Sequence, residues 1–163
     1  MELTIDAKLV TKTIGILRDF VGSRTDLGSF IRLDVTDSVF SLSAMDESTY
    51  TTLSLPLEDF GIDVTREGSV FVKADAFLRI IVLVHPVTAE GTGCSFVVLS
   101  DTDQAFQISY DTIYRGGSLL KNSRSIPKDY GNKFPAVAPI EKPSFSIESS
   151  DLKRCLKKAH FLV

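Results

Sequence analysis

Residues 70–81 read VFVKADAFLRII, a short alternating apolar run that leads directly into an amphipathic helical pattern. Val72 is followed five positions later by Phe77, and then by Arg79 and Ile81. Two other stretches have the same order of apolar, apolar, basic and apolar positions: Ile5, Val10, Lys12 and Ile14, and then Ile147, Leu152, Arg154 and Leu156. Strands followed by helices are common enough to match by chance, but the shared basic position favours an internal repeat of about 70 residues.

The segments after the first two predicted helices have the alternation that is typical of half-buried strands. The expected helices cover residues 6–22, 73–86 and 150–160, and the expected strands cover residues 28–35, 39–45, 51–56, 94–100, 105–110 and 113–120. The fold class is therefore predicted to be α+β. One domain over residues 1–120 would hold two strand–helix–three-strand repeats, about 1–66 and 67–120, with the helices on one face of antiparallel sheets.

The composition changes after this domain. Residues 121–142 are rich in Ser, Pro, Lys, Asn and Gly and are expected to connect two domains. Residues 143–163 are expected to form the first strand and helix of a second, incomplete domain. Because the strands that would cover this helix are missing from the sequence, the chain is expected to be a fragment of a longer protein, or to dock its last segment on another subunit.

The overall composition is that of a soluble domain with a packed core, since 44% of the 163 residues are hydrophobic. The N-terminal residues lack the pattern of a secretory signal, and the longest aliphatic run, residues 80–84, is too short to span a bilayer. Cys94 and Cys155 have neither the number nor the spacing of a disulfide framework or a zinc site. An intracellular protein with reduced, structural cysteines is expected, with no membrane partner.

The charge is divided unevenly along the chain, although the net charge is only −3. The three predicted helices carry nine cations and four carboxylates, whereas the rest of the chain carries nine cations and 17 carboxylates. Basic helix faces would attract phosphates without reading base sequence. The alternative for any one of these faces is an ordinary solvated surface.

The sequence lacks the common catalytic motifs. The sequence has no phosphate-binding glycine loop, no nucleophile elbow and no paired His and Cys at ligand spacing. His85 and His160 are isolated, and the acidic pairs, such as Asp101 with Asp103, fall in predicted turns. No enzyme activity, metal or cofactor is expected.

Several stretches resemble the DNA sliding clamps. The opening MELTIDAKLVTKTIGILRDF (1–20) is similar to the first strand and helix of a clamp, FSLSAMDESTYTTLSLP (40–56) to the segment after it, and VFVKADAFLRII (70–81) to the start of the second repeat. Residues 133–163 are similar to the crossing between the first two domains of bacterial and phage clamps. The segment SAMDES (43–48) looks more like the eukaryotic and archaeal type, and the bacterial or phage type is favoured.

The resemblance implies a ring that encircles duplex DNA, with helices lining the hole and sheets forming the outer wall. Such a clamp would tether the replicative polymerase, bind DNA independently of sequence and interact with a clamp loader. The DNA-side candidates are the cations of the predicted helices and one beyond the first: Lys8, Lys12, Arg18, Arg24, Lys73, Arg79, Lys153, Arg154, Lys157 and Lys158. A bacterial or phage clamp would work in the cytoplasm at the nucleoid, and a eukaryotic one in the nucleus.

The resemblance also implies an apolar groove for partner peptides near the domain crossing. The candidates are one residue of the SAMDES segment and four around the connector: Met45, Ile126, Tyr130, Phe134 and Val137. For all five, core packing or anchoring of the connector is the alternative. The competing hypothesis for the whole chain is an oligomeric scaffold or binding module that has the clamp fold but does not encircle DNA.

Overall fold

The structure is a computed structural model that describes residues 1–18, 30–45 and 50–128. Its elements are β1 (Glu2–Asp6), α1 (Ala7–Arg18), β2 (Phe30–Val35), β3 (Val39–Met45), β4 (Tyr50–Pro56), α2 (Leu57–Phe60), β5 (Asp63–Arg66), β6 (Gly68–Lys73), α3 (Ala74–Ile81), β7 (Phe96–Asp101), β8 (Phe106–Ile113) and β9 (Leu119–Ile126). The order β1–α1–β2–β3–β4 returns as β6–α3–β7–β8–β9, which confirms the two predicted repeats. The short α2 and β5 lie between them.

The two repeats exchange their first strands. One sheet has the order β5-β1-β7-β8-β9 and the other the order β4-β3-β2-β6, and all neighbours are antiparallel. Ile5 of the first repeat lies opposite Val97 of the second, while Val72 of the second lies opposite Ile31 of the first. Each sheet therefore contains strands of both repeats, so the repeats cannot separate without breaking both sheets.

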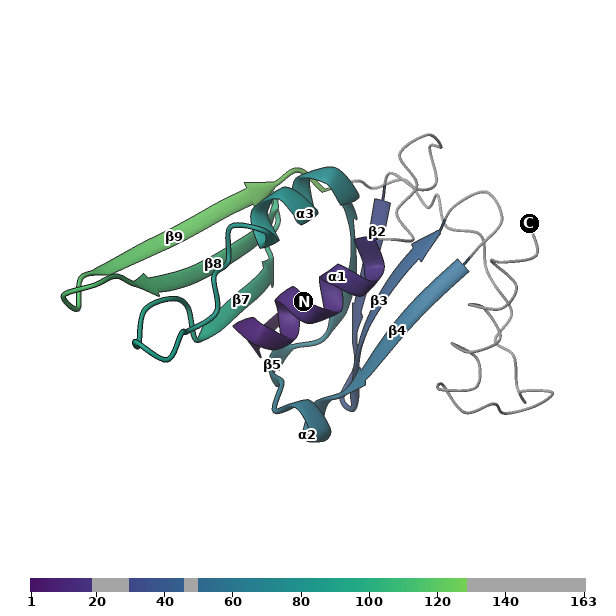
Figure 1. Cartoon of the computed structure of the whole chain (residues 1–163). Coiled ribbons are helices and arrows are strands. Elements are labelled where there is room, and N and C mark those ends of the chain that lie inside the picture. The colour runs from purple at the N-terminus through teal and green to yellow at the C-terminus, as the bar shows by residue number, and fades with distance from the viewer. Residues whose placement is uncertain (19–29, 46–49, 129–163) are drawn as a thin grey trace, which may run out of the picture.

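The helices α1 and α3 contact each other and pack against strands of both sheets (Figure 1). The carboxylate of Asp6 caps α1, because it accepts hydrogen bonds from the backbone N–H groups of Lys8 and Leu9 at 2.8 and 3.1 Å. On α3, the positions three and seven residues after Ala74 are Phe77 and Ile81, and all three are buried. This spacing gives α3 one apolar side, so its polar residues face solvent.

The largest differences from the sequence prediction are at three boundaries. The last strand was expected at residues 113–120, but residues 114–118 form the turn between β8 and β9, with Gly116 and Gly117 at φ of 87° and 80°. The strand continues to Ile126, within the expected connector, because the register with β8 runs from Leu119 opposite Ile113 to Ile126 opposite Phe106. Helix α3 ends at Ile81, five residues earlier than expected. The predicted helix at 150–160 and the predicted second domain lie outside the described residues.

The chain remains fixed for two residues after β9. Lys128 forms an ion pair with Asp101 at the end of β7, with 2.9 Å between Nζ and Oδ1, and the two side chains are 13% and 21% exposed. Its ammonium also donates to the carbonyl of Thr102 at 2.5 Å. A half-buried ion pair is screened by solvent less than a surface pair, so this contact holds Lys128 against the end of β7.

Candidate nucleic-acid interface

Helix α1 presents cations to solvent. Lys8 and Lys12 are one turn apart and both are exposed, whereas Ala7 and Val10 are buried in the core. The side chains follow this division because residues four apart lie on the same face of a helix. Arg18 is the last residue of α1. The described length of α1 contains no carboxylate to offset these charges.

Helix α3 presents a weaker positive charge. Arg79 is 83% exposed, and it lies 3.7 Å from the carboxylate of Asp75, one turn earlier, which is 66% exposed. Exposed pairs of this kind are only loosely held, so Arg79 can exchange this partner for a phosphate. Lys73 is exposed at the last residue of β6, where it alternates with the buried Val72 and therefore lies on the side of the strand away from the core.

Lys8, Lys12 and Arg79 are exposed on two helices that contact each other and pack on a common core. We call Lys8, Lys12 and Arg79 the helical face. Outside it, carboxylates outnumber cations on the described strands and turns. Phosphates would therefore be attracted to the helical face more than to the rest of the described surface.

The remaining predicted site residues are placed differently. Ile126 is 1% exposed and belongs to the core, so the core-packing alternative holds for it and it does not line an open groove. Met45 is the last residue of β3. Seven predicted DNA and groove residues after β9 lie outside the described part of the chain, as does Arg24: Tyr130, Phe134, Val137, Lys153, Arg154, Lys157 and Lys158.

Two described side chains have pKa values that burial raises. Burial raises the pKa of the Cys94 thiol, whose Sγ donates to the carbonyl of Phe96 at 3.0 Å, so this thiol stays protonated near neutral pH. Burial also raises the pKa of Tyr110. Within residues 1–18, 30–45 and 50–128, no three His, Cys, Asp or Glu side chains are grouped in a way that could hold a metal ion. No helix in these ranges is long and apolar enough to cross a membrane.

The chain matches no protein-family model and no curated protein, but it matches solved structures. It is similar to Caulobacter crescentus pol III beta, at a TM-score of 0.73 and 20% identity over 97% of this chain and 38% of that chain. It is similar to the DNA polymerase III subunit beta of Pseudomonas aeruginosa, at a TM-score of 0.71 and 21% identity over 96% of this chain and 38% of that chain. A Helicobacter pylori beta clamp bound to a DNA ligase peptide matches at a TM-score of 0.59 and 18% identity over 86% of this chain and 34% of that chain.

These proteins are bacterial clamps, which is the type that the sequence favoured over the eukaryotic and archaeal type. The chain spans about 38% of the length of the first of them. At these identities the likeness concerns the fold, and it covers almost all of this chain. The chain therefore has the fold of the bacterial DNA polymerase III beta subunits, the sliding-clamp fold.

Proposed function

We propose that this chain is part of a sliding clamp that encircles duplex DNA and tethers a replicative polymerase to its template. The observation that carries the proposal is the helical face: in a chain with the clamp fold, the exposed sides of α1 and α3 carry cations while the remaining described surface is mainly acidic. This distribution suits a duplex on the helix side of the sheets. The protein would act at the nucleoid.

The proposed mechanism is topological. A closed ring cannot leave DNA sideways, so the cations only need to keep the duplex centred, and tight contacts would oppose sliding. Lysines that contact phosphates bind without sequence preference. The Asp75 carboxylate beside Arg79 fits this role, because it lowers the positive charge without removing it.

Ring closure would use the edges of the sheets. Strand β9 is the last strand of the five-stranded sheet and β4 the last of the other, so each has one row of backbone groups without a strand partner among the described residues. Such edges pair readily with another chain or domain. Lys121 and Arg124 are exposed on β9, which carries no carboxylate, so a partner strand with acidic side chains would fit best.

The partners of the proposed clamp are duplex DNA, a polymerase and a clamp loader. The Helicobacter pylori clamp was solved with a DNA ligase peptide, and we propose that this protein also docks peptides of replication proteins. Met45, Tyr130, Phe134 and Val137 remain the proposed groove residues. The protein would catalyse no reaction itself.

The proposal predicts a difference between circular and linear DNA. The protein is incubated with a nicked plasmid long enough for rings to open spontaneously, and the complex is isolated by gel filtration at moderate salt. We expect the protein to stay with the circle and to be lost when a restriction enzyme linearises it, because a ring slides off a free end. Equal retention on both forms would indicate ordinary binding, and a scaffold with the clamp fold would bind neither.

A further inference from the structure

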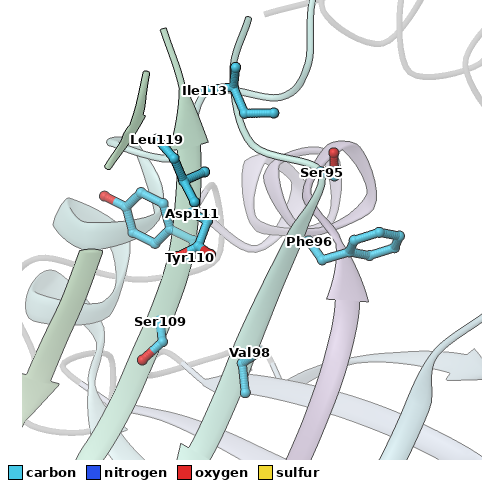
Figure 2. A pocket seen from close by; sticks show the side chains of 8 residues that line it. All are labelled: Ser95, Phe96, Val98, Ser109, Tyr110, Asp111, Ile113 and Leu119. Atoms are coloured by element: carbon cyan, nitrogen blue, oxygen red, sulfur yellow. The ribbon is translucent and has the colours of Figure 1, made fainter. Parts of the chain in front are cut away.

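The five-stranded sheet has a hollow on the side away from the helices, with a volume of about 300 Å³ (Figure 2). Val98 lies opposite Ser109, and Ile113 lies opposite Leu119, so these side chains share one face of the sheet. Val97, Ile108 and other alternate residues of the same strands are buried beneath the helices. The volume is at the lower end of the range for ligand pockets, about 300 to 1,000 Å³.

Exposed apolar side chains gather around this hollow. Phe96 is 58% exposed and Leu119 56%, and Ile113 is also exposed. The matching face of the other sheet is polar, because Ser41 pairs with Ser54 and Ser43 with Thr52 through their hydroxyl groups. The exposed apolar side chains are thus gathered on the outer face of one sheet. Such a gathered patch is typical of an interaction surface, whereas single exposed apolar residues scattered over a protein are not.

One carboxylate gives the hollow its charge. Asp111 is the charged residue among those that line it, and it is exposed. Lys121 lies opposite Asp111 on β9, but within the described residues Asp111 takes part in no ion pair. The hydroxyl groups of Ser95 and Ser109 add hydrogen-bond acceptors. An apolar hollow with a carboxylate at its side fits a ligand that is apolar at one position and cationic at the next.

We infer that this hollow, the outer pocket, binds a short segment of a partner protein that carries an aliphatic side chain followed by an arginine. The aliphatic side chain would lie against Ile113 and Leu119, which face each other across β8 and β9. The guanidinium would pair with the carboxylate of Asp111 through two hydrogen bonds. The inference does not depend on the proposed function, because the outer pocket lies on the opposite side of the sheet from the helical face.

The test uses N-acetyl-leucyl-arginine amide as the probe and the full chain labelled with ¹⁵N. We expect saturable shifts of the backbone amides of Val98, Ser109 and Asp111, and unchanged amides on α1. Asp111→Asn should weaken binding roughly tenfold, because it removes the charge from two hydrogen bonds. Asp37→Asn, a matched loss of an exposed carboxylate in the turn after β2, should leave binding unchanged.

Two further measurements keep the test decisive. Leu119→Ser removes an exposed apolar side chain and should weaken the probe while the amide spectrum stays dispersed, so a folding defect would be recognised. N-acetyl-leucyl-glutamate amide should bind far more weakly than the arginine probe. Equal binding of the two probes, shifts centred elsewhere, or no saturable shift at all would overturn the inference.

Discussion

Replacement of Lys8, Lys12 and Arg79 by glutamine is expected to weaken binding of the protein to duplex DNA by on the order of 100-fold at low salt. Each charge that approaches a phosphate to 4 Å contributes about 1 kcal/mol in water, and three such contacts are lost. The logarithm of the binding constant should also depend less steeply on the logarithm of the salt concentration, by roughly 2 to 3 units of slope. Fluorescence anisotropy with a labelled 30-base-pair duplex at several salt concentrations measures both effects.

A matched control separates position from net charge. Ser38, Thr65 and Ser118 are exposed and lie outside α1 and α3, so their replacement by glutamate changes the net charge by the same three units. This variant should bind DNA nearly as the unchanged protein does. If the two triple variants lose affinity equally, the helical face has no special role and only the overall charge matters.

Phe77→Ala is expected to lower the free energy of unfolding by about 3 to 5 kcal/mol, the usual cost of truncating a buried phenylalanine. Phe77 is 0% exposed and packs against Phe106 of β8, with 6.2 Å between ring centroids and 50° between ring planes. It also faces a small internal space that Val10, Phe40 and Leu99 help to line. The side chain therefore joins α3 to both sheets, and the cavity left by its removal cannot close by movement of one element.

Urea denaturation followed by circular dichroism measures this loss as a lower midpoint with an unchanged slope. The control is Leu83→Ala, just after the same helix, where the side chain is 51% exposed and the change should stay within about 0.5 kcal/mol. A loss below about 1 kcal/mol for Phe77→Ala would mean that α3 is not seated on the two sheets as described.

The sequence predicted the repeated order of elements because the pattern of apolar residues in each element is visible within its own stretch of sequence. The apolar residues that mark the repeat are buried in the core: Val10 and Phe77 are 3% and 0% exposed, and the strand residues Ile5 and Val72 are 1% and 0% exposed. A pattern of this kind depends only on which residues of a single helix or strand are buried. The two repeats and the α+β class were therefore predictable.

The exchange of β1 and β6 between the sheets could not be predicted in this way. Alternation shows which side of a strand is buried, but Ile5 would be buried beside either repeat. The length of β9 was missed for a related reason: residues 121–126 are polar, except Ile126, because most of this edge strand is exposed. This polar composition resembles that of a connector between domains, whereas the pairing with β8 makes these residues part of a strand.

The candidate site was predictable in part. Lys8, Lys12 and Arg79 were predicted from helical spacing, and the structure places them at exposed positions of two neighbouring helices. The outer pocket was missed because its residues come from β7, β8 and β9 and meet only through strand register. The one signal in the sequence was Phe96, a large aromatic residue at a strand position that alternates with the buried Val97 and Leu99.

The measurement that tests the account most directly is negative-stain electron microscopy of the protein at its native length. The account predicts closed rings with a central hole at least roughly 20 Å wide, enough for a duplex. Averaged images would also count the domains around the ring. Compact particles without a hole, at concentrations where the protein is fully assembled, would contradict encirclement of DNA even though the repeats and their sheets would stand.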